Sequence, residues 1–220
     1  INLSIIRELG QKDVPVIGVG TAATSMAAAS RHCSQAIIRP AGPIMSWMPD
    51  IVRRTGAMAL FAVSETDLLQ LASGPKYIGK CQVLTPRLEQ LQRALSKSDT
   101  LSAARKLGFD VPQTWQPRAG EDFAARIAEQ TFPAIAKWDN PNDILPLLEE
   151  AGLKWEKAEF VSNAGQLDRL LDRFQTIGRW PLIQSYCDGV GLGQMLYMRR
   201  DRATLRFQHV RLHEWPPEGG

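Results

Sequence analysis

Cysteine and histidine are both scarce in this chain, with three of each among 220 residues. The cysteines (Cys33, Cys81 and Cys187) are odd in number and show no CxxC spacing. The sequence therefore predicts neither a disulfide framework nor a thiolate zinc site, and it favours a reducing cytoplasm. His209 and His213 are four residues apart, but their context is typical of a strand, where that spacing makes no helical metal-binding face.

Long apolar runs and basic tracts are also missing. No run approaches the roughly 20 residues needed to cross a membrane, and the chain opens on Ile1-Asn-Leu-Ser rather than on a signal peptide. The 26 Lys and Arg residues are scattered, so nucleic-acid binding has little support. An apolar content of 44% and a charged content of 22% are typical of a globular protein, and the length suits one or two domains.

One glycine motif lacks the context that it needs. Gly18-Val-Gly-Thr-Ala-Ala23 matches a loose dinucleotide fingerprint, which requires a following helix and an acidic residue at the end of the next strand. That strand, residues 36–40, ends on Arg-Pro instead. We interpret the motif as a false match. A Rossmann-type oxidoreductase is kept as an alternative, which binding of NAD(P)H rather than ATP would favour.

Strands and helices alternate up to about residue 84, which predicts a parallel three-layer α/β sheet. The first helix should end at a Gly10 cap and feed a strand, the second half of a βαβ unit, so we expect the chain to begin one element into its first domain. The expected helices are residues 3–10, 44–55 and 67–71, and the expected strands are residues 14–20, 36–40 and 57–63.

The second part of the chain predicts a different order of elements. Thr85 should cap a helix with Pro86 at its first position, and a second helix should close at Gly108. Residues 138–154 are rich in Asp, Asn and Pro and predict an irregular segment with one short helix. Ser162 should cap a helix whose inner face is Leu167, Leu170, Leu171 and Phe174. Further expected elements are a helix at 121–130, strands ending at Lys137 and covering 158–161 and 181–187, and a hairpin of 195–199 and 204–212 about Asp201.

Two lysines and one strand suggest a binding chemistry. Phe132-Pro-Ala-Ile-Ala-Lys137 is an apolar strand that ends on a cation, and Lys97 lies just before a helix. About fifty residues later a strand runs into Gly189. Lysines neutralise phosphate oxygens as point charges, and backbone groups in an apolar slot can hold adenine. These are the parts of an ATP site.

The order of the parts resembles the ATP-grasp superfamily, most closely its carbamoyl-phosphate-synthase-like ligases. The resemblance covers nearly the whole chain. Lys97, with the strand Phe132–Lys137, resembles the lysines of the family. The other matching segments are Ala103-Ala-Arg-Lys-Leu-Gly-Phe-Asp-Val-Pro-Gln-Thr114, the hinge-like Leu182-Ile-Gln-Ser-Tyr-Cys-Asp-Gly189 and the strand and loop Phe207-Gln-His-Val-Arg-Leu-His-Glu-Trp-Pro-Pro-Glu-Gly-Gly220.

The resemblance implies an α/β fold, in which a Rossmann-like pre-ATP-grasp domain precedes an incomplete α+β ATP-grasp domain. We expect the first domain at residues 1–84, without its first strand, and the second at 85–220, with a C-terminal subdomain beginning at 181. It also implies ATP and Mg²⁺ as cofactors. The implied chemistry is activation of a small-molecule carboxylate through an acylphosphate and capture by an amine-type acceptor, without nucleic-acid or membrane partners.

Residue by residue, the resemblance gives ATP contacts to Lys97, Lys137, Gln184, Ser185, Tyr186 and Cys187. His209 and Arg211 would lie on the phosphate or substrate side, and no catalytic residue or metal ligand is assigned. Alternatives stay open: Lys97 as a solvated helix-start lysine, Tyr186 as a packing residue and His209 as a surface histidine. Cys187 lacks a nearby base in the sequence, so we do not expect a nucleophile.

Three departures from the family qualify these expectations. Ser185 stands where a glutamate is usual, and residues 138–143 (Trp-Asp-Asn-Pro-Asn-Asp) replace a glycine-rich loop. The family's magnesium ligands, a glutamate and then a glutamate–asparagine pair, would fall beyond residue 220. Because phosphoryl transfer needs that metal, we expect a truncated chain that binds ATP weakly and does not turn it over alone. A non-enzymatic nucleotide-binding or regulatory module is the alternative.

Overall fold

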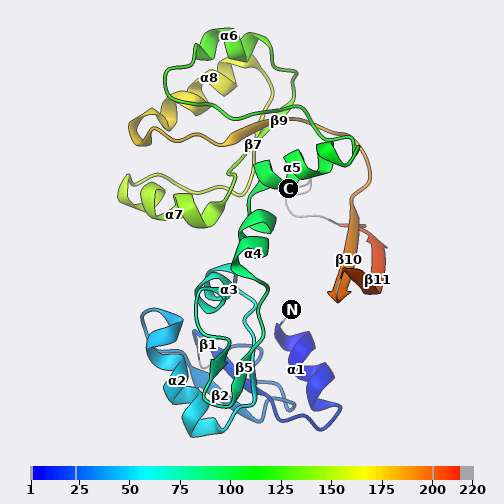
Figure 1. Ribbon diagram of the computed structural model, residues 1–220. Helices are drawn as coiled ribbons and strands as arrows, with labels where there is room; N and C mark the ends of the chain where they lie inside the picture. The colour runs from blue at the N-terminus through cyan, green and yellow to red at the C-terminus, as the bar shows by residue number, and fades with distance from the viewer. Residues whose placement is uncertain (1, 23, 200, 214–220) are drawn as a thin grey trace. The chain divides into compact units, whose positions relative to one another are not determined.

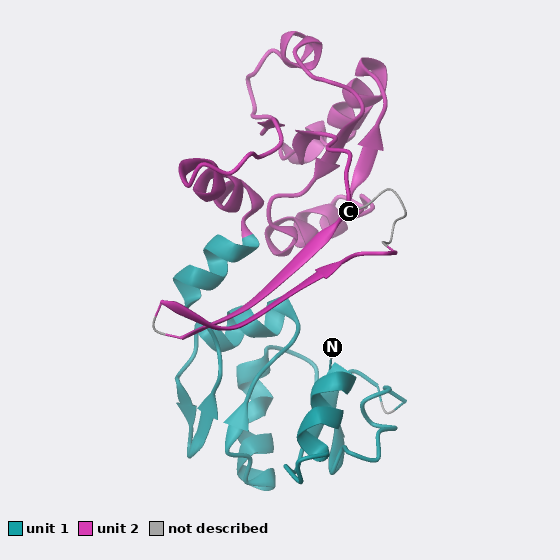
Figure 2. Cartoon of the chain, turned by 90° about the vertical axis from the view of Figure 1, so that its right-hand side faces the viewer, with its two compact units in different colours: residues 1–95 teal, residues 96–220 magenta. Residues whose placement is uncertain are grey.

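The computed structural model describes residues 2–22, 24–199 and 201–213 (Figure 1). The chain forms two compact units, residues 1–95 and 96–220 (Figure 2). Each unit combines helices with small sheets around its own cluster of buried apolar side chains. None of the described helices is long and apolar enough to cross a membrane.

Unit 1 mixes short strands and helices, and two pairs of its strands follow one another without an intervening helix. Its helices are α1 (Asn2–Gly10), α2 (Ile44–Thr55), α3 (Glu65–Ala72) and α4 (Leu88–Leu95). Its strands are β1 (Ile17–Gly20), β2 (Gln35–Ile38), β3 (Ala59–Leu60), β4 (Tyr77–Ile78) and β5 (Cys81–Val83).

The strands of unit 1 do not form the single parallel sheet that we expected. β1 pairs in parallel with β2, while β5 pairs in parallel with β3 and antiparallel with β4, giving two separate small sheets in the described residues. The apolar run 57–63 contributes only the two residues of β3. Met58 is 67% exposed and Phe61 is 41% exposed, so this run is not buried on both faces as a central parallel strand would be.

The core of unit 1 is built on one face of α2. Ile44, Trp47, Met48 and Ile51 recur at helical spacing and pack with Leu71, Cys81 and Val83. α2 ends where Gly56 adopts a left-handed conformation with φ of 65°, which glycine accommodates without strain. Burial also raises the pKa of the Cys81 thiol.

Two expected helix ends are wrong in detail. Gly10 is the last residue of α1 and not a left-handed cap; the left-handed residue of that turn is Asp13, with φ of 57°. α4 begins at Leu88 rather than after a Thr85 cap, and Thr85 and Pro86 lie in the link between β5 and α4. Both differences concern how the chain leaves or enters a helix, which depends on neighbouring elements as well as on the capping residue.

Unit 2 contains a four-stranded antiparallel sheet in the order β6-β9-β7-β8. The strands are β6 (Thr114–Trp115), β7 (Ala134–Lys137), β8 (Glu159–Val161) and β9 (Leu182–Ser185). β9, which we expected to open a C-terminal subdomain, is paired on both sides within this sheet. The helices are α5 (Lys97–Lys106), α6 (Phe123–Ala128), α7 (Pro141–Glu150) and α8 (Ala164–Arg173), with a 3₁₀ turn at Gln175–Ile177.

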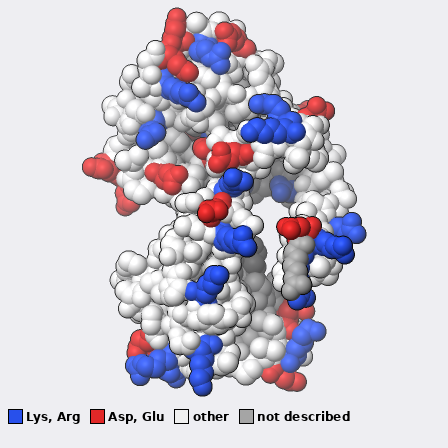
Figure 3. Space-filling model, viewed as in Figure 1, with Lys and Arg blue, Asp and Glu red and all other residues white. Residues whose placement is uncertain are grey.

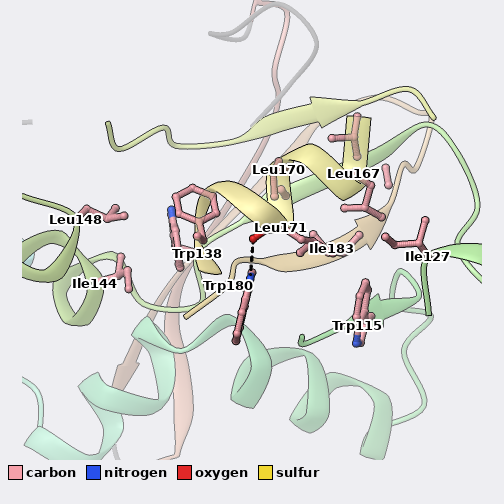
Figure 4. Packing of buried hydrophobic residues seen from close by; sticks show 14 residues of the cluster. Trp115, Ile127, Trp138, Ile144, Leu148, Leu167, Leu170, Leu171, Trp180 and Ile183 are labelled. Carbon is pink, nitrogen blue, oxygen red and sulfur yellow. Dashed lines mark hydrogen bonds between the residues drawn. The ribbon is translucent and has the colours of Figure 1, made fainter. Parts of the chain in front are cut away.

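The core of unit 2 lies between this sheet and its helices (Figure 4). The predicted inner face of α8 is confirmed, since Leu167, Leu170, Leu171 and Phe174 are all at most 6% exposed. The ring of Phe174 meets Trp138 edge-on, with a centroid distance of 4.9 Å. These contacts make α8 the main cover of one face of the sheet.

The cap of α8 is one residue later than predicted. The side chain of Asn163 accepts a hydrogen bond from the backbone N–H of Gln166, while the N–H of Ser162 donates to the side-chain oxygen of Gln166. Ser162 therefore lies outside the helix. Asparagine and serine are equally good caps in sequence terms, so the capping residue could not be chosen from residue type alone.

The segment 138–154 is more regular than we expected. α7 occupies ten of its residues, with Asn140 as the N-cap and Pro141 in the first turn. Asn followed by Pro is a helix-start signal, and Ile144 and Leu148, four residues apart, are buried against the core. Asp, Asn and Pro are common in loops, but in the order Asn140-Pro141 they mark the start of a helix.

The chain then forms the hairpin of β10 (Leu192–Arg199) and β11 (Arg202–Val210), as predicted. Asp201 lies at its turn in a left-handed conformation with φ of 63°. The hairpin is a separate two-stranded sheet in the described part of the chain.

Candidate functional site

The two faces of the four-stranded sheet differ in chemistry. Side chains alternate between faces along a strand, and the register pairs Ile135 with Gln184 and Lys137 with Leu182. Ala136 and Ile183 point to the opposite face, which is the one packed in the core with α8. The second face, called here the lysine face, carries Ile135, Lys137, Phe160, Leu182 and Gln184. Tyr186 follows β9, and its ring lies beside that of Phe160.

The lysine face is largely apolar, and three of its residues, Ile135, Leu182 and Gln184, are buried. Ile135 is 8% exposed and Leu182 1% exposed, and the buried Gln184 donates from its side-chain nitrogen to the hydroxyl oxygen of Thr114 at 3.2 Å. The ring of Tyr186 lies 6.1 Å from that of Phe160, although Tyr186 is still 38% exposed. Tyr186 therefore packs and also presents an accessible edge.

Lys137 and the hinge segment Ser185–Cys187 lie at opposite ends of the β7–β9 pair. Lys137 is opposite Leu182, and Ala134 is opposite Ser185. Three residues of strand separate the two positions, which is about 10 Å. The half-buried Lys137 thus marks one end of the lysine face and the hinge marks the other.

Lys97 is anchored to the segment that follows Lys137. It is the first residue of α5 rather than a residue before it, and its ammonium donates to the carbonyl oxygens of Trp138 at 2.7 Å and Asp139 at 3.0 Å. The two lysines are therefore brought to the same end of the sheet. Two of the three donors of Lys97 are used on backbone carbonyls.

Asp139 completes this anchor, and the sequence reasoning missed it. Its carboxylate accepts from the backbone N–H of Ser98 at 2.7 Å and from the hydroxyls of Ser98 and Ser96. Acidic groups are favourable at a helix N-terminus. We call Ser96, Lys97, Ser98, Trp138 and Asp139 the Asp139 network. The Ser-x-x-Asp pattern of residues 96–99 signals the helix start but not its distant partner.

The hinge offers few backbone groups to a ligand. The N–H of Ser185 donates to the carbonyl of Gln113 at 2.9 Å, and the N–H of Tyr186 donates to the carbonyl of Pro133 at 3.1 Å. The backbone N–H of Cys187 has no acceptor among the described residues. Cys187 is therefore the hinge residue whose N–H is available.

His209 and Arg211 lie on or next to the hairpin. His209 is opposite Gly193 and its ring occupies the space where a Cβ of residue 193 would be, 2.1 Å from the nearest ring carbon. The same ring stacks on Phe207, and its Nδ1 is buried without a partner among the described residues. The backbone N–H of Arg211 donates to Gly191. Residues 214–220 of this motif lie outside the described residues.

The glycine fingerprint fails structurally as well as in sequence. Gly18 and Gly20 lie within β1, and the described residues from 21 to 34 form turns rather than the required helix; Ala23 lies outside the described residues. This confirms the interpretation as a false match.

On the face of the molecule in Figure 3, Lys and Arg are interspersed with Asp and Glu. No group of three metal-ligating His, Cys, Asp or Glu side chains occurs in the part of the chain that is described.

Comparison with known protein families and with characterised protein sequences gives no match. Solved structures do match. The N5-carboxyaminoimidazole synthetase of Staphylococcus aureus, complexed with ADP, has a TM-score of 0.66 at 10% identity, with 97% of this chain and 52% of that chain covered. The L-amino acid ligase of Bacillus licheniformis has a TM-score of 0.60 at 13% identity, covering 96% and 47%.

A third similar structure is the biotin carboxylase domain of a Hydrogenobacter thermophilus 2-oxoglutarate carboxylase, in complex with MgADP, ADP and bicarbonate. Its TM-score is 0.59 at 14% identity, with 87% of this chain and 43% of that chain covered. The chain thus spans about half the length of the solved structures that it matches. The resemblance seen in the sequence is confirmed at the level of fold: this chain has the ATP-grasp fold over the part of those enzymes that it covers.

Proposed function

We propose that unit 2 binds an adenine nucleotide along the lysine face. The observation that carries the proposal is the register of β7 and β9, which puts Lys137 and Gln184 on one face, opposite the core. An apolar slot with a few fixed polar groups is the usual form of a cofactor site. The solved structures of similar fold were obtained with ADP, ATP or MgADP, which supports the choice of ligand.

In this proposal the base lies at the hinge end. The N–H of Cys187 donates to a ring nitrogen of adenine, and the partly exposed ring of Tyr186 provides apolar contact. Ser185 donates no hydrogen bond to the base, because its backbone N–H is bonded to the carbonyl of Gln113. Its role is to hold the hinge in place. Gln184 is held by Thr114 and orients the middle of the slot.

The phosphates lie at the other end, where Lys137 is the direct contact. Lys97 is assigned a second role beside it. Since its ammonium is bonded to two carbonyls, it adds positive charge near the phosphates and positions the segment after β7. Mg²⁺ would supply charge neutralisation during phosphoryl transfer. The described residues provide no three-residue cluster for it, so no step is routed through the metal.

The reaction class that fits this fold is ATP-dependent activation of a carboxylate through an acylphosphate, followed by capture by an amine-type acceptor. We place this chemistry in a reducing cytoplasm because the three cysteines are unpaired. The proposed domain limits stay at residues 1–84 and 85–220. A nucleotide-binding module without turnover is the second candidate. It is favoured by the segment after β7, where a bonded Asp139 and the start of α7 stand in place of a glycine-rich loop.

Thermal unfolding with and without ATP tests nucleotide binding. A ligand at 100 times its dissociation constant adds about 2.7 kcal/mol of stability. We expect this stabilisation in the intact chain and in the control Lys157→Ala, an exposed lysine off the lysine face, and its loss in Lys137→Ala. Equal stabilisation of both variants, or stabilisation by NAD(P)H but not by ATP, would contradict the proposal. Phosphate release above the Lys137→Ala background separates the ligase from the module.

A further inference from the structure

A groove of about 710 Å³ opens in unit 2 away from the lysine face. Three segments form its walls: the residues after β6, the first turns of α7 and the residues before β9. The side chains that matter for its chemistry are Arg118, Trp138, Ile144, Leu147, Arg179 and Trp180. Its size lies within the range of small-molecule sites.

The walls of the groove are fixed by hydrogen bonds. The side-chain nitrogen of Gln116 donates to the carbonyl of Trp180 at 3.1 Å, which ties the first wall to the third. The indole N–H of Trp180 donates to the carbonyl of Leu171 at 2.9 Å, shown as the dashed line in Figure 4. Asn140 caps the helix of the remaining wall. The groove is therefore largely formed before any ligand binds.

The groove lies on the other side of the sheet from the lysine face, although Trp138 and Asp139 of its lining also belong to the Asp139 network. Trp138 and Trp180 belong to the core cluster that also contains Ala136 and Ile183. Those residues point to the face of the sheet opposite Lys137 and Gln184. A ligand in the groove would thus be on the helix-covered side of the sheet.

Two arginines supply the cationic donors of the groove. Arg118 and Arg179 are both exposed and form no ion pair among the described residues. The indole N–H of Trp138 likewise has no acceptor in the described part of the chain. The lining also carries two acids: Asp139 accepts from the backbone N–H of Ser98, and one carboxylate oxygen of Asp143 accepts from the side chain of Asn140.

Apolar groups complete the lining. Ile144 is buried, and Leu147, one helical turn later, is 40% exposed. Two guanidinium groups beside an aliphatic wall suit a ligand with one anionic and one apolar end. Arginine is the side chain best matched to a carboxylate, since its planar fork donates two parallel hydrogen bonds.

We propose that this groove binds a small monocarboxylate with an apolar or aromatic body. The carboxylate pairs with Arg118 and Arg179, and the body packs on Ile144 and Leu147. The inference does not rest on the nucleotide site, which uses the other face of the sheet.

Calorimetric titration with 3-phenylpropionate tests the proposal, with 3-phenylpropan-1-ol as the uncharged probe of the same shape. Hydrogen bonds to charged groups contribute enough that we expect the alcohol to bind at least about tenfold more weakly. The variant Arg118→Gln with Arg179→Gln should lose about tenfold for the acid, whereas Arg105→Gln on α5 should not change the affinity.

A matched pair on α7 tests the apolar wall. Leu147→Glu puts an anion into the groove and should abolish binding, while Leu145→Glu, at a position 41% exposed and outside the groove, should not. Equal affinity for acid and alcohol, no binding of the acid by the intact chain, or unchanged binding by the double arginine variant would overturn the proposal. Loss of binding in Lys137→Ala would also overturn it, since the acid would then occupy the nucleotide site.

Discussion

Unit 2 contains two sets of antiparallel strands that differ in how much apolar surface they bury. In the four-stranded sheet, Ala134, Ala136 and Ile183 are at most 4% exposed. In the hairpin of β10 and β11, Tyr197, Leu205 and Phe207 are between 61% and 69% exposed. Both sets have the composition of strands, so the difference lies in what covers them. The sheet has helices over its core face, and the hairpin exposes large apolar side chains in the described structure.

The difference shows that two strands can pair without burying their apolar side chains. Pairing of two strands needs only their own hydrogen bonds, but an isolated two-stranded hairpin is marginally stable in water. The Phe207–His209 stack over Gly193 supplies some local packing within the hairpin. The stability of unit 2 should therefore come from the sheet and its helices, with little from the hairpin.

Phe174→Ala should have the largest effect and is the strongest test of this difference. Phe174 is 1% exposed and lies against Trp138. Truncation of such a ring removes apolar contact and leaves a cavity, at a cost of about 3–5 kcal/mol. Denaturant unfolding measures it. A loss below 1 kcal/mol would show that the sheet core is not the main source of stability.

Asp139→Ala should have the next largest effect. It leaves the N–H and hydroxyl of Ser98 without their acceptor, which costs about 1–3 kcal/mol. The same change should weaken ATP binding, because Lys97 is held by the same segment. Asp139→Asn keeps an acceptor oxygen and serves as the milder control. Unfolding free energies that do not distinguish the three proteins would argue against the network.

Asn163→Ala should cost about 1 kcal/mol through loss of the cap of α8. Ser162→Ala is its matched control and should change the unfolding free energy far less, because the Ser162 hydroxyl caps nothing in the structure. Chemical denaturation of the two variants side by side decides which residue caps the helix. A larger loss for Ser162→Ala would restore the cap suggested by the sequence.

Leu205→Thr combined with Phe207→Thr should have the smallest effect on stability, within about 0.5 kcal/mol, since exposed positions contribute little. Its visible consequence should be reduced self-association at high protein concentration, because it removes exposed apolar surface. Light scattering and thermal unfolding measure the two quantities. A large fall in melting temperature would mean that the hairpin packs as tightly as the sheet.

Local patterns predicted most elements of the fold. The spacing of Leu167, Leu170, Leu171 and Phe174 identified the buried face of α8, and the apolar run ending at Lys137 identified β7. The extent of the sheets was harder to predict from the sequence. The run 57–63 is apolar enough for a central strand, but only its neighbours in space decide that Met58 and Phe61 remain exposed.

The candidate site was predictable in its residues and not in its connections. Lys97 and Lys137 were selected for their charge and their place at element ends. That Lys97 bonds the carbonyls of Trp138 and Asp139 depends on a contact across about forty residues, which no local pattern encodes. Asp139 was missed for the same reason. The register of β7 against β9, which creates the lysine face, is likewise a tertiary property.

Only three residues, Trp138 to Asn140, link the end of β7 to the start of α7. Both ends of this link are fixed: Asp139 bonds to α5, and Asn140 caps α7. So short a link, fixed at both ends, cannot fold over a bound nucleotide. This link should therefore not act as a gate, and release of a fluorescent ATP analogue should show no slow phase that depends on its opening.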